Sequence, residues 1–190
     1  YVDQSTFYHN RDDGVMATGT SRLEMVNSYT GDHPEGFGAI ILQGATAIFR
    51  NVTFANIGTN FGPTGGTNGI EFADDFTGYG YVENSRFYNC TANGIFVHSA
   101  PNQIQILNNV FSGNWAGVTL HADAAQPIYV RVAGNSFLTP SNATYQTFGV
   151  TATGSRSHLI VGGPGANQNY FDGFANHQFI AMNDGTSSNQ

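Results

Sequence analysis

Residues 84–97 read Asn84-Ser85-Arg86-Phe87-Tyr88-Asn89-Cys90-Thr91-Ala92-Asn93-Gly94-Ile95-Phe96-Val97. The stretch joins an aromatic residue that follows an Asn/Ser cluster, a turn, and a short apolar strand that opens with Gly. The same motif returns seven times along the chain. Self-similarity at a spacing of about two to three dozen residues predicts a solenoid, with one coil for each motif.

The aromatic residues of the motif, and the strands that follow them in the sequence, define the spacing of the repeats. The aromatic residues are Phe7, Tyr29, Phe54, Phe87, Phe111, Phe137 and Phe171. The strands begin at positions 14, 38, 69, 94, 117, 149 and 178, which are 24, 31, 25, 23, 32 and 29 residues apart. Turn-forming residues at 57–66 and 139–144 predict loops that leave the solenoid. We expect an all-β, single-stranded parallel β-helix of about seven coils, forming one domain over residues 1–190.

Composition excludes several classes of function. The formal net charge is −7 and Lys is absent, which argues against nucleic acid as a partner because such binding depends on basic patches. No apolar run is long enough to cross a bilayer, so no membrane role is expected. The chain opens at Tyr1 inside a motif, and we expect it to be part of a longer chain.

Alternation along each Gly strand predicts which side chains face the core. The residue after each glycine, and the one two places on, should point inward. These residues are Val15, Ala39, Ile70, Ile95, Val118 and Val150, followed by Ala17, Ile41, Phe72, Val97, Leu120 and Ala152. The motif aromatic residues form a further inward column. Asn68 and Asn93, just before two of the strands, suit turn positions with left-handed backbone.

Two strings make the pattern specific. They are Ile106-Leu107-Asn108-Asn109-Val110-Phe111-Ser112-Gly113-Asn114 and Leu159-Ile160-Val161-Gly162-Gly163-Pro164-Gly165-Ala166-Asn167. With them the chain resembles the right-handed parallel β-helix of the pectate-lyase superfamily over essentially its whole length, and among its members most the phage tailspike depolymerases. The resemblance implies right-handed coils. The superfamily holds polysaccharide lyases, glycoside hydrolases, epimerases, tailspikes and non-enzymatic adhesins, so fold alone does not choose an activity.

The acidic and histidine residues that could take part in catalysis lie at or just after outward-facing positions of the Gly strands. Because side chains at equal offsets stack on neighbouring coils, we expect one group of acidic and histidine side chains along one edge of this sheet. Its members are Glu71, Asp74, Asp75, His98, His121 and Asp123. The catalytic candidates are Glu71, Asp74, Asp75, His98 and His121. Two carboxyl groups flanking a glycosidic bond can act as acid and nucleophile or base.

Alternatives remain for each of these residues. Glu71 beside the Asp74-Asp75 turn also fits a solvated surface carboxylate. A neutral His can abstract a proton in a lyase or epimerase, and two His with Asp123 or Asp75 can instead hold a metal. Surface histidines without a role are the remaining interpretation of His98 and His121.

Substrate-binding candidates complete the expected site. Phe96 and Trp115 offer flat apolar faces for sugar rings, as do Phe76, Tyr79 and Tyr81. Asp123, Asp12 and Asp13 offer carboxylates for hydroxyl groups. The acidic turns at Asp12-Asp13 and Asp32-His33-Pro34-Glu35 supply oxygen ligands of the kind calcium prefers, without the spacing of a defined calcium loop. We expect no cofactor, with calcium as the one alternative.

The predicted function is an extracellular carbohydrate-active protein that cleaves or modifies a bacterial surface polysaccharide, as a glycoside hydrolase or a lyase. The alternative is a glycan-binding adhesin or structural solenoid without turnover. Open solenoid ends need covering, and further coils or a homotrimer like that of the tailspikes would provide it.

Overall fold

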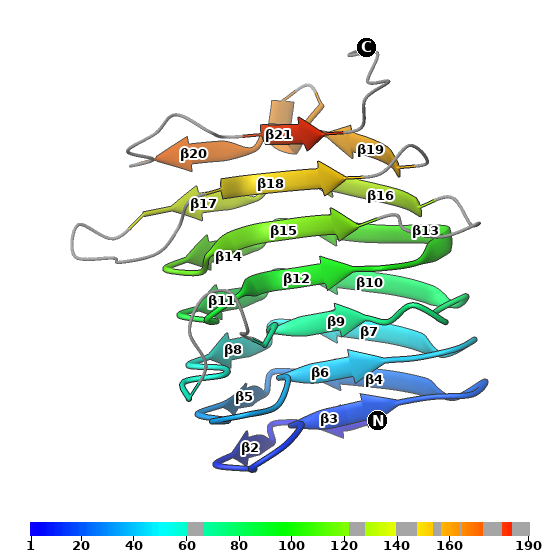
Figure 1. Cartoon of the computed structure of the whole chain (residues 1–190), viewed down its shortest axis with the longest axis vertical. Helices are drawn as coiled ribbons and strands as arrows, with labels where there is room; N and C mark the ends of the chain where they lie inside the picture. Colours follow the sequence, from blue (N-terminus) through cyan, green and yellow to red (C-terminus); the bar gives the residue numbers. More distant parts are fainter. Residues whose placement is uncertain are drawn as a thin grey trace.

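The computed structural model describes residues 1–60, 67–121, 128–139, 148–153, 157–163, 165–172 and 180–183. Within these ranges the chain forms strands and one 3-10 turn, η1 (Gly165–Asn167), and no α-helix. The strands form three sheets of seven strands, and every strand pairing is parallel (Figure 1). No helix in the described part of the chain is long and apolar enough to span a membrane.

Each sheet is named here after its first strand. The β1 sheet contains β1 (Val2–Asp3), β4 (Arg22–Val26), β7 (Thr46–Arg50), β10 (Tyr79–Glu83), β13 (Ala100–Leu107), β16 (Ile128–Ala133) and β19 (Ser157–Val161). The β2 sheet contains β2 (Thr6–Tyr8), β5 (Tyr29–Gly31), β8 (Thr53–Ala55), β11 (Arg86–Tyr88), β14 (Val110–Ser112), β17 (Ser136–Leu138) and β20 (Tyr170–Asp172). The β3 sheet contains β3 (Val15–Ala17), β6 (Ala39–Ile41), β9 (Ile70–Phe72), β12 (Asn93–Val97), β15 (Ala116–His121), β18 (Phe148–Thr153) and β21 (Ile180–Asn183).

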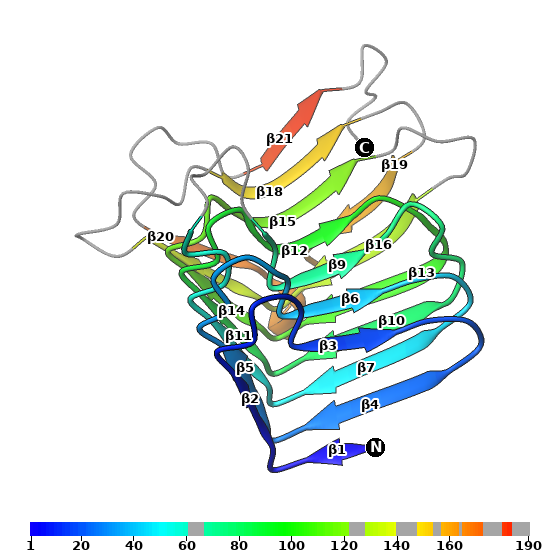
Figure 2. The same cartoon turned by 60° about the horizontal axis from the view of Figure 1, so that its bottom comes forward.

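Each coil contributes one strand to each sheet in turn, so the chain climbs from the N-terminal coil to the C-terminal one (Figure 1). Figure 2 brings the N-terminal end forward and shows the three sheets as walls around the core. The predicted inward column pairs in register across the β3 sheet, from Val15 opposite Ala39 up to Val118 opposite Val150. The prediction of a parallel β-helix of about seven coils is confirmed.

Stacked phenylalanines fill the core behind the β2 sheet. Phe54, Phe87, Phe111, Phe137 and Phe171 lie one above another, with successive ring centroids 4.8, 4.8, 4.9 and 4.8 Å apart. This distance is the spacing of neighbouring strands in a sheet. The ring stack therefore follows directly from the coil repeat.

Tyr29 does not belong to the predicted aromatic column. Thr30 pairs with both Phe7 and Phe54, whereas Tyr29 pairs with Thr53. The Tyr29 hydroxyl donates to Asp32 Oδ2 at 2.8 Å, which holds the ring away from the core. The prediction is wrong for Tyr29 because a one-residue shift exchanges the two faces of a strand.

Asparagine side chains stabilise the corner between the β1 and β2 sheets. Asn27, Asn51, Asn84 and Asn108 have positive φ at this corner, a conformation that Asn tolerates better than most residues. Next to them, Asn109 and Asn135 are buried, and the Oδ1 of each accepts the backbone N–H of the residue one coil below: Ser85 for Asn109 and Asn109 for Asn135, both at 2.8 Å. These bonds satisfy backbone groups that the corner leaves without strand partners.

His33 is buried as a neutral side chain. Its Nδ1 accepts the backbone N–H of Asn10 at 3.2 Å, so its Nε2 carries the proton and donates to Thr30 Oγ1 at 2.9 Å. Burial lowers the pKa of His33. Protonation of the ring would remove the acceptor that Asn10 uses.

This arrangement predicts a pH-dependent stability. With the folded pKa below the ordinary value, the contribution of His33 is full above about pH 6.5 and is lost as the pH falls toward the folded pKa, with a slope of at most about 1.4 kcal/mol per pH unit. Urea unfolding between pH 7 and pH 5 should show a shallower pH dependence for His33→Gln than for the parent. The exposed His158→Gln variant serves as control, and an unchanged slope for His33→Gln would refute this assignment.

Candidate active site

Neighbouring strands β9, β12 and β15 position the central residues of the site. Glu71 pairs with Phe96, and Phe96 pairs with Thr119. The residues on either side of Glu71, Ile70 and Phe72, are fully buried in the core. Alternation therefore turns Glu71 and Phe96 to the outer face of the β3 sheet, where both are half-buried.

His98, the residue after β12, lies between two carboxylates. Its Nε2 is 3.5 Å from Glu71 Oε1, and its Nδ1 is 2.9 Å from Asp74 Oδ1. The Glu71 side chain is 15% exposed and that of Asp74 87% exposed. One imidazole thus contacts a shielded carboxylate and a solvated one, through opposite ring nitrogens.

Phe96 and His121 extend this group along the sheet edge. The Phe96 ring centroid is 4.3 Å from that of His98 and 6.2 Å from that of His121. The two imidazoles are 6.3 Å apart between centroids, and His121 Nδ1 is 2.7 Å from Thr153 Oγ1. The structure brings Glu71, Asp74, His98, His121 and Phe96 together, and we call these five residues the Glu71 cluster.

A buried chain of hydrogen bonds ends on Glu71. Thr151 donates to Thr119 at 2.9 Å, Thr119 to Asn93 at 2.6 Å, Asn93 to Asn68 at 2.8 Å, and Asn68 to Glu71 Oε2 at 2.9 Å. All four donors point in the same direction, an order in which successive bonds strengthen one another. The chain fixes the orientation of the Glu71 carboxylate.

Sequence reasoning missed this chain. Asn68 and Asn93 were expected in left-handed turns, but neither has a positive φ. Both are buried, and their amides bond each other across neighbouring coils instead. The signal was present in the paired Asn-Gly sequences at 68–69 and 93–94, whose equal offsets predict contact between the two amides.

The comparison with protein families agrees with this architecture. Residues 1–137 match the family model described as a right handed beta helix region. The chain belongs to this family. The match confirms the right-handed winding expected from sequence. No curated protein and no solved structure matches the chain.

Asp75 lies next to the Glu71 cluster in this right-handed β-helix but has another partner. Its Oδ1 accepts the backbone N–H of Gln43 at 3.2 Å. The bond joins the turn after β9 to the turn after β6, one coil below. Asp74, and not Asp75, is the carboxylate that contacts His98.

Trp115 lies at the opposite end of the strands from His121. It directly precedes β15, which ends at His121, and its ring packs edge-on against Phe148 with centroids 5.3 Å apart. The other aromatic candidates are also elsewhere: Phe76 is fully buried in the core, and Tyr79 and Tyr81 belong to the β1 sheet. Among these aromatic candidates, all of which lie in the described part of the chain, only Phe96 belongs to the Glu71 cluster.

The acidic turns near the N-terminus form a separate group. Asp12 and Asp13 precede β3, two coils below β9, and Asp13 Oδ1 accepts the backbone N–H of Phe37 at 3.0 Å. Asp32 accepts from Asn56 and Tyr29, and the Asn56 bond is the main cause that lowers the pKa of Asp32. A hollow of about 310 Å³ lies beside Asp32, lined also by His9, Pro34 and Thr59. Asp13 and Asp32 support turns of the β-helix through these bonds, and Asp12, Asp13 and Asp32 all lie apart from Glu71.

Asp123 lies outside the described residues. Among the residues that the structure describes, no group of three or more His, Cys, Asp or Glu side chains is arranged to hold a metal ion.

Proposed function

We propose that this protein is an extracellular carbohydrate-active β-helix protein that cleaves or modifies a bacterial surface polysaccharide, in the manner of tailspike depolymerases of the pectate-lyase superfamily. The contact of His98 with both Glu71 and Asp74 supports the proposal most strongly. The buried hydrogen-bond chain that ends on Glu71 holds its carboxylate in one orientation on the outer face, as suits a group that must meet a substrate.

The contacts suggest a division of roles. Because Nδ1 of His98 contacts Asp74, the opposite ring nitrogen, Nε2, faces Glu71 Oε1, and one proton held on either of these two atoms can pass to the other. Imidazole changes its charge between about pH 5 and 8 and suits proton transfer near neutrality. Glu71 and His98 then act as the acid and base at the sugar, and Asp74 orients His98.

Phe96 and His121 would position the sugar. The half-buried Phe96 ring offers an apolar face against which a pyranose can pack. Two reactions fit this arrangement. One is hydrolysis of the glycosidic bond, with Glu71 as the acid and His98 as the base that activates water. The other is lyase cleavage, with His98 removing a proton next to a uronate carboxyl.

Incubation with a panel of bacterial capsules, lipopolysaccharides, pectin and alginate tests the proposal. Chain length and new reducing ends report cleavage, and ultraviolet absorbance of an unsaturated uronate separates lyase from hydrolase. We expect at least one polymer to be shortened. Binding without any shortening or chemical change of the bound polymer would contradict catalysis and favour the glycan-binding alternative.

Asn68 should be a positioning residue for this reaction. Asn68→Ala removes the donor to Glu71 Oε2 and leaves the amide of Asn93 without its acceptor. We expect kcat to fall about 10- to 100-fold with little change in KM, because small displacements of a reacting group have effects of this size. Asn109→Ala is a matched control. It also removes a buried amide that is hydrogen-bonded to an Asn on the next coil, but it lies at the corner between the β1 and β2 sheets. Equal kcat values for the two variants would refute positioning by Asn68.

A further inference from the structure

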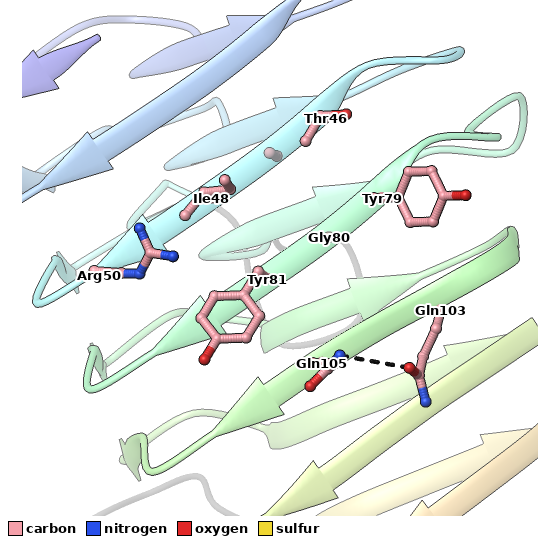
Figure 3. Close-up of a pocket in the computed structure, with 9 residues that line it drawn as sticks. Thr46, Ile48, Arg50, Tyr79, Gly80, Tyr81, Gln103 and Gln105 are labelled. Carbon is pink, nitrogen blue, oxygen red and sulfur yellow. Dashed lines mark hydrogen bonds between the residues drawn. The ribbon is translucent and has the colours of Figure 1, made fainter.

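The outer face of the β1 sheet holds a second candidate site, away from the Glu71 cluster on the β3 sheet. A pocket of about 260 Å³ is formed there by β7, β10 and β13 (Figure 3). The residues that line the pocket include Ile48, Arg50, Tyr79, Tyr81, Gln103 and Gln105. Tyr81 stands opposite Ile48 on one side and Gln105 on the other.

Tyr79 and Tyr81 give this pocket two flat surfaces. They are alternate residues of β10 and share its outer face, about 7 Å apart at the backbone. Gly80 between them faces the core, where an added Cβ would meet the Phe72 ring at 2.8 Å. Figure 3 shows both rings nearly face-on from outside, and Tyr79 is 58% exposed. The Tyr79 ring is therefore open to a ligand, and the Tyr81 ring beside it is half-buried.

The Tyr81 ring is fixed in place. The Arg50 guanidinium carbon is 5.2 Å from its ring centroid, a distance at which a cation and an aromatic face attract. Arg50 is itself held by Glu24 at 2.9 Å and by Glu83 at 3.6 Å. A fixed ring loses little conformational entropy when a ligand packs on it.

Charge around the pocket indicates the kind of ligand. Glu24 and Glu83 compensate the charge of Arg50, so among the described residues that line the pocket no cation is left uncompensated for an acidic group. The remaining polar side-chain groups of the lining are neutral: the hydroxyl groups of Thr46, Tyr79 and Tyr81 and the amides of Gln103 and Gln105. Gln105 Nε2 donates to Gln103 Oε1 over a long 3.4 Å. The two amides still have donors and acceptors for hydroxyl groups.

We propose that this face binds a neutral glycan chain, with sugar rings stacked on Tyr79 and Tyr81 and hydroxyl groups bonded to Gln103 and Gln105. Flat apolar faces with a few neutral donors and acceptors match the two faces and the rim of an uncharged pyranose. The site needs no acid or base and does not depend on the reaction proposed for Glu71. It would bind a polymer on the β1 sheet, whereas the Glu71 cluster lies on the β3 sheet.

Calorimetric titration with neutral and acidic hexasaccharides tests this site. The probes are the hexamers of cellulose, starch and mannan, with hexagalacturonate as the acidic comparison. We expect at least one neutral hexamer to bind, and Tyr79→Ala and Tyr81→Ala each to weaken its binding about 10-fold. Tyr170→Ala, an exposed tyrosine of the β2 sheet, should leave binding unchanged, and so should Glu71→Gln.

Failure of all neutral hexamers to bind would overturn the proposal. A preference for hexagalacturonate, or unchanged binding in both tyrosine variants, would do the same. A self-association of the protein that Tyr79→Ala abolishes would also overturn it, because it would assign the face to a second copy of the chain. Loss of binding in Glu71→Gln alone would place the sugar at the Glu71 cluster instead.

Discussion

Glu71→Gln is expected to lower kcat/KM for polysaccharide cleavage about 100- to 10,000-fold, the range typical of a lost general acid or base. The substitution keeps the size of the side chain and an acceptor for Asn68, but it removes the carboxyl group that we propose exchanges a proton with His98. The effect should fall on kcat more than on KM, because the lost interaction belongs to the transition state. Initial rates of reducing-end release on the polymer identified by the panel provide the measurement.

A matched carboxylate provides the control for this prediction. Glu35 lies in the turn before β6, at the opposite end of the strands from Asp74 and His98, and pairs with Arg11 at 3.0 Å. Glu35→Gln should cleave at the parent rate. Full activity of Glu71→Gln would remove Glu71 from the reaction, whatever the behaviour of Glu35→Gln.

Phe111→Ala should destabilise the solenoid by about 3–5 kcal/mol, the usual result of removing a buried aromatic ring. Phe111 is fully buried and stacks between Phe87 and Phe137 at 4.8 and 4.9 Å. Each coil of a solenoid is stabilised chiefly by its neighbours, so a cavity in a middle coil weakens the contact on both sides.

Urea unfolding followed by circular dichroism measures this loss. Tyr170→Ala is the comparison, since Tyr170 is 57% exposed on the same sheet, and it should change the free energy of unfolding by less than about 0.5 kcal/mol. A Phe111→Ala variant as stable as Tyr170→Ala would contradict the observed stacking.

Repetition made the fold predictable from sequence. Glycine-led strands such as 94–97 and 117–120 recur with an aromatic residue six to nine positions before them, except where the loops at 57–66 and 139–144 are inserted. Coil length and inward columns therefore follow by alignment of the repeats. Tyr29 shows the limit of this reasoning. An aromatic residue at the right spacing was assigned to the core, whereas a hydrogen bond to Asp32 and the buried Thr30 decide the register there.

The site was predictable only as far as strand alternation reaches. Equal offsets on neighbouring coils correctly placed Glu71 opposite Phe96, and His98 near His121. Alternation ends with the strand, so it gave no basis for choosing between Asp74 and Asp75 in the following turn. Tyr79 and Tyr81 were likewise expected near the acidic residues, because only the path of the chain after that turn shows that they belong to another sheet.

We propose that coil stacking makes Glu71 and His98 one proton-transfer unit. A double-mutant cycle of Glu71→Gln and His98→Asn on kcat/KM measures whether the two residues act together, since groups that do so give strongly non-additive losses. We expect the double variant to be no slower than the slower single variant. Losses that multiply in the double variant would show that the two residues act independently and would refute a shared unit.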